Sequence, residues 1–299
     1  MSDLPPQLLF AGGVAVAMPF FLTVFNAALN SPRVAFLKPS TRVFCASCFK
    51  DLVHALISGP IGCIMLYQML NDEHAHLTCK FHQPNIITGM PVPPLATFIG
   101  GFSVGFFVAD CIVLFISREQ MSEELGGRTA YALMWVHHLL AICIWPYALL
   151  ESASAIFAVY FLATELSNVG QNLYVLASRG RLFGHRSDTA ALRVGVLWLL
   201  TFFALRVAPV PYLGTIYVRG HFLVPTIAPK MNLFYHWPYG CGLDHIEWWV
   251  SVISIAIPVC LNQYWFCKML AKARRALNGT SRATQDRRER ERIRVGKKG

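Results

Sequence analysis

Two adjacent imidazoles and a carboxylate lie inside stretches of this 299-residue chain that are otherwise apolar. His137 and His138 stand in one stretch, and Glu165 stands in the next. A histidine oriented by a carboxylate is a usual arrangement for general acid and base catalysis. An ionisable side chain inside a membrane helix costs roughly 2.5–3.5 kcal/mol by insertion scales and points by default to a functional site. The pattern favours a buried acid–base site, with polar bonding between helices as the alternative.

Seven apolar stretches are long enough to cross a bilayer, which takes about 20 residues. The composition, 55% hydrophobic and 14% charged, differs from that of soluble domains, in which about a quarter of the residues are charged. We therefore expect an all-α, polytopic membrane bundle of seven transmembrane helices. The stretches cover residues 7–29, 43–70, 94–116, 130–149, 152–177, 190–211 and 245–270.

Basic residues indicate how this bundle is oriented. The loops on one side, together with the C-terminal tail, hold 21 Lys and Arg residues, and the opposite loops hold 3. Because Lys and Arg concentrate in cytoplasmic loops, we expect a lumenal or extracellular N-terminus and a cytoplasmic C-terminus. The net charge of +10 comes mostly from the tail, whose arginines do not alternate with aromatic residues, so nucleic-acid binding is not predicted.

Polar residues of separate predicted helices fall at one depth. With a rise of about 1.5 Å per residue counted from the turn near residue 150, His137 and Glu165 lie within about 3 Å of the same level. For the Lys50–Asp51 doublet an internal ion pair is favoured over a ligand contact. Arg206 is the exception, because it lies deeper toward the lumen and is interpreted as a tether for a carbonyl group or a lipid headgroup. The remaining members of the layer are Asp110, His54, Asn262 and Gln263, of which Asn262 and Gln263 are favoured as bonds between helices.

The stretch 152–177 carries a polar stripe, because Glu165, Asn168 and Asn172 follow the i, i+3, i+7 spacing of one helix face. Adjacent residues of a helix point about 100° apart. We therefore expect one of His137 and His138 to address a substrate and the other to bond a neighbouring helix. A metal site is not predicted, because the ten histidines supply none of the repeated His-x-x-x-His or His-x-x-His-His sets of membrane di-iron enzymes.

These motifs resemble the TLC-domain superfamily, which includes the ceramide synthases. The resemblance runs from about residue 42 to residue 270 and is greatest to the group of TLC domain-containing protein 4. It implies a six-helix barrel around a cavity, preceded by one extra helix in residues 1–41 and followed by a basic tail in residues 271–299. The motifs are Ala109-Asp110, Val136-His137-His138-Leu139, Thr164-Glu165-Leu166-Ser167-Asn168 with Asn172, Arg206-Val207 and Leu261-Asn262-Gln263-Tyr264-Trp265-Phe266.

The resemblance implies a protein of the endoplasmic-reticulum membrane that binds a fatty-acyl chain or a sphingolipid and affects membrane composition. An acyl-CoA-dependent N-acyltransferase and a cargo or assembly receptor are the alternatives, and the plasma membrane and a homodimer stay open. Acyl-CoA would be a substrate, and no cofactor is expected. The candidate catalytic residues are His137, His138, Glu165 and Asp110, and the candidate substrate-binding residues are Asn168, Asn172, Asn262, Arg206, Lys50 and Asp51.

One departure from the ceramide synthases bears on catalysis. The synthases pair the two histidines with a His-Asp and a further Asp on the following helix, where this chain has Glu165, Asn168, Gln171 and Asn172. The resemblance therefore implies the fold and the histidine pair, and it implies acyl-CoA transfer less directly. Cys79 and Cys241 fall in loops on the lumenal side, where a disulfide and two free thiols are equal alternatives.

Overall fold

The computed structural model describes residues 4–71, 92–150, 155–180, 187–218, 253, 255–271 and 273–274. All regular structure in these residues is helical, and five helices in them are long and apolar enough to cross a membrane. An all-α membrane protein is thereby confirmed, whereas the count of seven spans stays a prediction. The five are α1 (Pro6–Leu29), α2 (Pro39–Asn71), α4 (Pro94–Ile116), α6 (Arg128–Leu150) and the stretch Ala190–Thr215.

The shorter elements correct the predicted helix plan in two places. The stretch 152–177 is not one helix, because a turn at Glu165 separates α7 (Ala155–Thr164) from α8 (Leu166–Ser178). The predicted loop 117–129 contains a helix, α5 (Arg118–Leu125). The stretch predicted at 190–211 consists of α9 (Ser187–Phe202), a π-helical turn η3 (Phe203–Val207) and α10 (Val210–Val218), and residues 255–271 form the last described helix.

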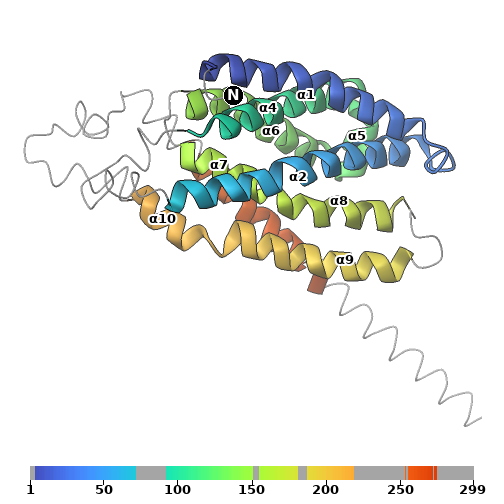
Figure 1. Ribbon diagram of the computed structural model, residues 1–299. Coiled ribbons are helices and arrows are strands. Elements are labelled where there is room, and N and C mark those ends of the chain that lie inside the picture. Colours follow the sequence, from blue (N-terminus) through green and yellow to red (C-terminus); the bar gives the residue numbers. More distant parts are fainter. Residues whose placement is uncertain are drawn as a thin grey trace, which may run out of the picture.

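The long helices run side by side with their axes roughly aligned (Figure 1). Helix α1 packs along α4, and the contact depends on missing side chains. A Cβ atom on Gly101 would lie 2.1 Å from the carbonyl oxygen of Phe10, so only glycine permits this approach. Phe21 of α1 is fully buried and its ring centroid lies 5.1 Å from that of Phe102 of α4. The extra N-terminal helix is therefore packed into the bundle.

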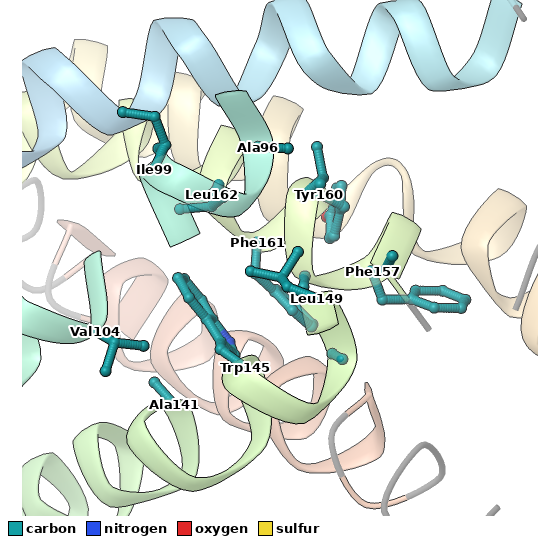
Figure 2. Close-up of a cluster of buried hydrophobic side chains, with 14 of the residues drawn as sticks. Ala96, Ile99, Val104, Ala141, Trp145, Leu149, Phe157, Tyr160, Phe161 and Leu162 are labelled. Atoms are coloured by element: carbon teal, nitrogen blue, oxygen red, sulfur yellow. The ribbon is translucent and has the colours of Figure 1, made fainter. Parts of the chain in front are cut away.

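Apolar side chains of α4, α6 and α7 make up much of the core (Figure 2). All ten residues of α7 are buried, including Phe157 and Leu162, and Leu149 of α6 is 1% exposed. Along α9 the large apolar side chains Leu192 and Leu200 are instead mostly exposed. Apolar surface of this kind is expected to face lipid in a membrane helix. The distribution separates a lipid-facing surface from an interior in which the polar residues must find partners.

A polar cluster joins the predicted cytoplasmic ends of three helices. The carboxylate of Glu124 in α5 accepts hydrogen bonds from Thr41 of α2, at 2.7 Å, and from Arg179, the residue after α8. Lys38 reaches Glu123 at 2.7 Å. Partial burial opposes ionisation of Glu124, but the bond from Thr41 and the charge of Arg179 outweigh it and hold the pKa of Glu124 below its ordinary value. The cluster fixes α5 against α2 and α8.

Candidate functional site

The first part of the site is a buried charge cluster between α2 and α4. The Lys50 ammonium is completely buried and donates to Asp51 at 2.7 Å and to Asp110 at 2.6 Å. It also lies 4.2 Å from the centroid of the Phe106 ring. The predicted Lys50–Asp51 ion pair is confirmed, and Asp110 joins it. A buried ammonium is tolerated only when it is paired in this way, so the cluster fixes the position of Asp110.

His138 of α6 approaches the same carboxylate. Its Nδ1 lies 3.2 Å from Oδ2 of Asp110, and each side chain is 4% exposed. The two atoms are at ion-pair distance without the alignment of a hydrogen bond. Glu165 and Asp110 are the two candidate catalytic carboxylates, and Asp110 is the one beside His138. His138 thereby contacts the neighbouring helix α4.

Glu165 occupies the turn between α7 and α8, where α2 comes close. A Cβ atom on Gly62 of α2 would lie 2.4 Å from the backbone nitrogen of Ala163, so a side chain there would push the turn away. Oε2 of Glu165 accepts a bond from Asn168 at 2.7 Å and lies 3.7 Å from Nδ1 of His54. The predicted Glu165–Asn168 pair of the stripe is thus in contact. Asn172 is buried as well, whereas Gln171 is exposed.

Arg206 belongs to the same layer as Glu165, which corrects its predicted position deeper toward the lumen. It lies in the π-helical turn η3, and its side chain points back toward the α7–α8 turn. A π-helical turn inserts an extra residue into a helix and occurs often at functional sites. The predicted carbonyl tether is confirmed, because Nη2 donates to the Thr164 carbonyl at 3.1 Å. Its other acceptors are Oγ of Ser167 at 2.8 Å, Oδ1 of Asn262 at 3.1 Å, Oδ1 of Asn168 at 3.2 Å and Oε1 of Glu165 at 3.5 Å.

The backbone of the π-helical turn has a partner of its own. The hydroxyl of Tyr160 in α7 donates to the carbonyl oxygen of Leu205 at 2.7 Å. Backbone carbonyls inside a membrane need such partners because lipid supplies none. The bond fixes η3 against α7 and keeps Arg206 beside Glu165.

A small cavity lies next to this cluster. It is bounded by α6, α7, η3 and the helix 255–271, and its volume is about 40 Å³. A single water needs about 10–15 Å³, so the cavity has room for a few heavy atoms. Its polar side is formed by His137, Thr164, Glu165, Arg206 and Asn262, and its apolar side by Leu140, Ala141, Ile144, Trp145, Phe161, Pro258, Leu261 and Trp265.

The two histidines have different positions. His137 lines the cavity, whereas His138 is buried beside Asp110 and is not among the described lining residues. The predicted division of roles between them stays a prediction. Of the candidate residues, Glu165, Arg206 and Asn262 line the cavity with His137. Asp110, Lys50, Asp51 and His138 form a separate charge cluster, and Asn168 connects to the cavity through Glu165 and Arg206.

Trp145, Thr164 and Trp265 are among the lining residues that were not predicted as site residues. Helical spacing could have identified two of them. Trp145 follows His138 by seven residues and Trp265 follows Asn262 by three, and both spacings return to the same helix face. The Trp265 ring packs against His137, with centroids 5.8 Å apart, and the Trp145 ring packs against Phe107, with centroids 5.4 Å apart. In Figure 2, Trp145 and Phe161 project from α6 and α7 into the same region.

Comparison with known protein families gives a match. The family model described as the TLC domain (TRAM, LAG1 and CLN8) matches residues 44–271, which is most of the chain. The chain matches none of the curated proteins with which it was compared. The match covers the charge cluster and the cavity, and it begins after α1.

Proposed function

Because the chain belongs to the TLC-domain family, we propose that it handles membrane lipids, binding a fatty-acyl or sphingolipid-like molecule in its intramembrane cavity and thereby affecting membrane composition. The observation that carries the proposal is the composition of the cavity wall. Hydrogen-bonding groups lie on one side of it and aliphatic and aromatic side chains on the other. Such a wall suits a molecule with a polar head and an apolar chain.

The charge balance of the polar layer supports a binding site more than simple bonding between helices. Asp51, Asp110 and Glu165 face two cations, Lys50 and Arg206, over a few turns of helix. Ionisable groups in a membrane interior are costly, and one hydrogen bond between membrane helices contributes only about 0.6 kcal/mol. Less costly residues would join the helices equally well, so a site is the better account of this cluster.

An N-acyltransferase is a second candidate, and the contact between His138 and Asp110 is what favours it. A carboxylate beside a histidine is an arrangement used to orient a general base. For catalysis His138 would have to reach a substrate, whereas the described cavity wall presents His137 instead. Lipid binding needs no such rearrangement, so it remains the first proposal.

The remaining assignments are part of the same proposal. They are residence in the endoplasmic reticulum, a lumenal N-terminus, a cytoplasmic C-terminus, the division at residues 41 and 270, and kinship with the group of TLC domain-containing protein 4. The charge asymmetry of the loops supports the orientation. Cys79, Cys241 and most of the basic tail lie outside the described residues.

Lipidomics of cells that lack the protein tests the proposal. Cells are rescued with the wild type, with His137→Ala, with His138→Ala, or with Val136→Ala as a matched control whose side chain is exposed on the same helix. We expect the wild type and Val136→Ala to restore the lipid profile and His137→Ala to fail at equal abundance in the membrane. Failure of His138→Ala with loss of N-acylated products would favour the acyltransferase. An unchanged lipidome in the deleted cells would contradict lipid handling and favour a receptor.

A further inference from the structure

We propose that the cavity takes the uncharged headgroup of a lipid, one that carries a hydroxyl or an amide, and excludes carboxylate, phosphate and ammonium headgroups. The inference rests on the proposed lipid-handling function and specifies its ligand. Three features of the described wall lead to it. They are its net charge, the groups that remain free to bond a ligand, and its size.

The charges of the wall cancel. Arg206 is the one cation and Glu165 the one anion among the described lining residues, and Nη2 of the first lies 3.5 Å from Oε1 of the second. Both residues are buried, at 5% and 6% exposure. A charged headgroup entering this wall would lose its hydration and find no free counter-charge, which is strongly unfavourable in an apolar setting.

The guanidinium of Arg206 is already engaged. Each of its three nitrogen atoms donates to an acceptor of the protein in the described part of the chain, and Nη2 has three acceptors. Arginine otherwise binds carboxylate and phosphate through two parallel N–H donors. Because Ser167, Asn262 and Thr164 already accept from these donors, only one of the five N–H groups, on Nη1, has no acceptor in the described residues. Arg206 therefore orders the wall and has no parallel pair of free donors for an anion.

The carboxylate of Glu165 is engaged in the same way. Oε1 accepts from Arg206, and Oε2 accepts from Asn168 and faces His54. The oxygens keep lone pairs, but the charge of Glu165 is already paired with that of Arg206, so an ammonium headgroup would meet a neutral pair. The wall therefore offers neither an unpaired carboxylate to a cation nor an unpaired guanidinium to an anion.

Asn262 and His137, on the polar side of the cavity, keep hydrogen-bonding capacity. Asn262 accepts from Arg206 with its oxygen, which fixes the orientation of its amide and leaves its NH₂ group without a bond inside the described residues. The ring nitrogens of His137 likewise make no hydrogen bond there, and in the neutral form they offer one donor and one acceptor. A hydroxyl or an amide, each both donor and acceptor, satisfies this set.

The size of the cavity favours small headgroups. Its volume of about 40 Å³ accommodates a few heavy atoms, which suits a hydroxyl or a primary amide. The chain of the ligand would lie against the apolar side, where Ile144, Phe161 and Leu261 are found. Charge, bonding capacity and volume thus select the same headgroups.

Photolabelling with four matched probes tests the inference. The probes share one eighteen-carbon chain with a diazirine and an alkyne, and end in an alcohol, a primary amide, a carboxylic acid or an amine. The purified full-length protein is labelled in phosphatidylcholine vesicles at a slightly alkaline pH at which the acid and the amine are charged. We expect the alcohol and the amide to label the segments 137–145 and 258–265 about tenfold more than the acid or the amine, because a buried unpaired charge is strongly penalised.

One isosteric variant makes the test sharper. Glu165→Gln removes the counter-charge of Arg206 and keeps the shape of the side chain, so labelling by the acid should rise about tenfold above wild type. Glu123→Gln is the matched control, since Glu123 pairs with Lys38 away from the cavity, and it should leave all four labelling levels unchanged. If Glu165→Gln does not fold, competition in the wild type between unlabelled octadecanol and stearate gives the same distinction, with only octadecanol expected to displace the alcohol probe.

The outcomes separate this inference from the function on which it rests. Equal labelling of the wild-type cavity by acid and alcohol, or no response of acid labelling in folded Glu165→Gln, overturns the headgroup assignment and leaves lipid binding intact. If no probe labels the two segments above the level of other membrane-facing peptides, the proposed lipid-binding cavity is itself wrong.

Discussion

Arg206 and Asn262, 56 positions apart in the sequence, are joined by a 3.1 Å hydrogen bond between Nη1 and Oδ1. The bond links the π-helical turn η3 to the helix 255–271 across the edge of the cavity. Because Arg206 also bonds the α7–α8 turn, one side chain connects three parts of the fold. The cavity wall therefore depends on a guanidinium and not simply on a positive charge.

Replacement of this arginine by lysine should be destabilising. In Arg206→Lys the charge is kept, but a single ammonium cannot reach Ser167, Thr164 and Asn262 together. With several buried acceptors left unpaired, we expect a loss of about 2–4 kcal/mol in unfolding free energy. Arg193→Lys, at an exposed position of α9, is the matched control and should change the stability by less than about 0.5 kcal/mol. Denaturation in mild detergent measures the stability of both variants. Equal stability of the two would contradict the hydrogen bonds described for Arg206.

The buried Lys50–Asp110 pair should behave as a coupled unit. Asp110→Asn leaves Lys50 with Asp51 alone, and loss of a buried partner costs about 3–5 kcal/mol. The double variant Lys50→Met/Asp110→Leu removes both charges and should be less destabilised than Asp110→Asn. The single variants Lys50→Met and Asp110→Leu complete a thermodynamic cycle with this double variant that measures the coupling, and strictly additive effects would show that the two residues do not form the pair.

The close approach of α2 to the α7–α8 turn gives a steric prediction. In Gly62→Ala the new methyl group would meet the backbone of Ala163, and overpacking of this kind costs about 1–3 kcal/mol. It should also displace Glu165 and lower ligand labelling of the cavity. Gly12→Ala is the control, because a Cβ atom there has no neighbour within 4 Å in the described structure, and alanine favours the helix α1. The unfolding midpoint of Gly62→Ala should fall below that of the wild type, and the midpoint of Gly12→Ala should rise above it.

The cluster around Glu124 predicts a dependence of stability on pH. Since hydrogen bonding and the Arg179 charge hold the pKa of Glu124 below its ordinary value of 4.5, the ionised group stabilises the folded state above that pH. This contribution should be lost as the pH falls below 4.5 and through the lowered pKa of the folded state. Glu124→Gln should be less stable at neutral pH and should flatten the acid limb of the stability curve.

The control for this pH effect is Glu119→Gln, an exposed position in the same helix α5. It should keep the acid limb of the wild type. Unfolding midpoints measured from about pH 3 to pH 7 cover the region in which glutamate titrates. An unchanged acid limb in Glu124→Gln would assign the pH dependence to other carboxylates.

The sequence predicts the features that depend on apolar length and on charge. The apolar stretches predict α1, α2, α4 and α6 within a few residues of their observed ends, because a bilayer sets the length of a helix that crosses it. The rarity of buried charge makes Lys50, Asp51 and Asp110 easy to single out and predicts the Lys50–Asp51 pair, whereas the contact of Lys50 with Asp110 is seen only in the structure. The TLC-domain resemblance over 42–270 is confirmed by the match over 44–271.

Local geometry that is set by packing could not be predicted in the same way. No proline or glycine marks the turn at Glu165, where Thr164 and Ser167 bond nearby backbone carbonyls and α2 approaches closely. The predicted depth of Arg206 assumes a straight α-helix. In the structure Arg206 lies in a π-helical turn, and its long side chain reaches back to the α7–α8 turn. The charge-rich helix α5 lacks the apolar periodicity on which helix prediction relies.

The most direct test of a lipid-binding cavity is native mass spectrometry of the purified full-length protein and two variants. Ala141→Leu adds bulk to the cavity wall, and Ala132→Leu makes the same change at an exposed position of the same helix α6. We predict that the wild type and Ala132→Leu carry one tightly bound lipid and that Ala141→Leu, at equal thermal stability, has lost it. Equal lipid retention by all three proteins would contradict the account.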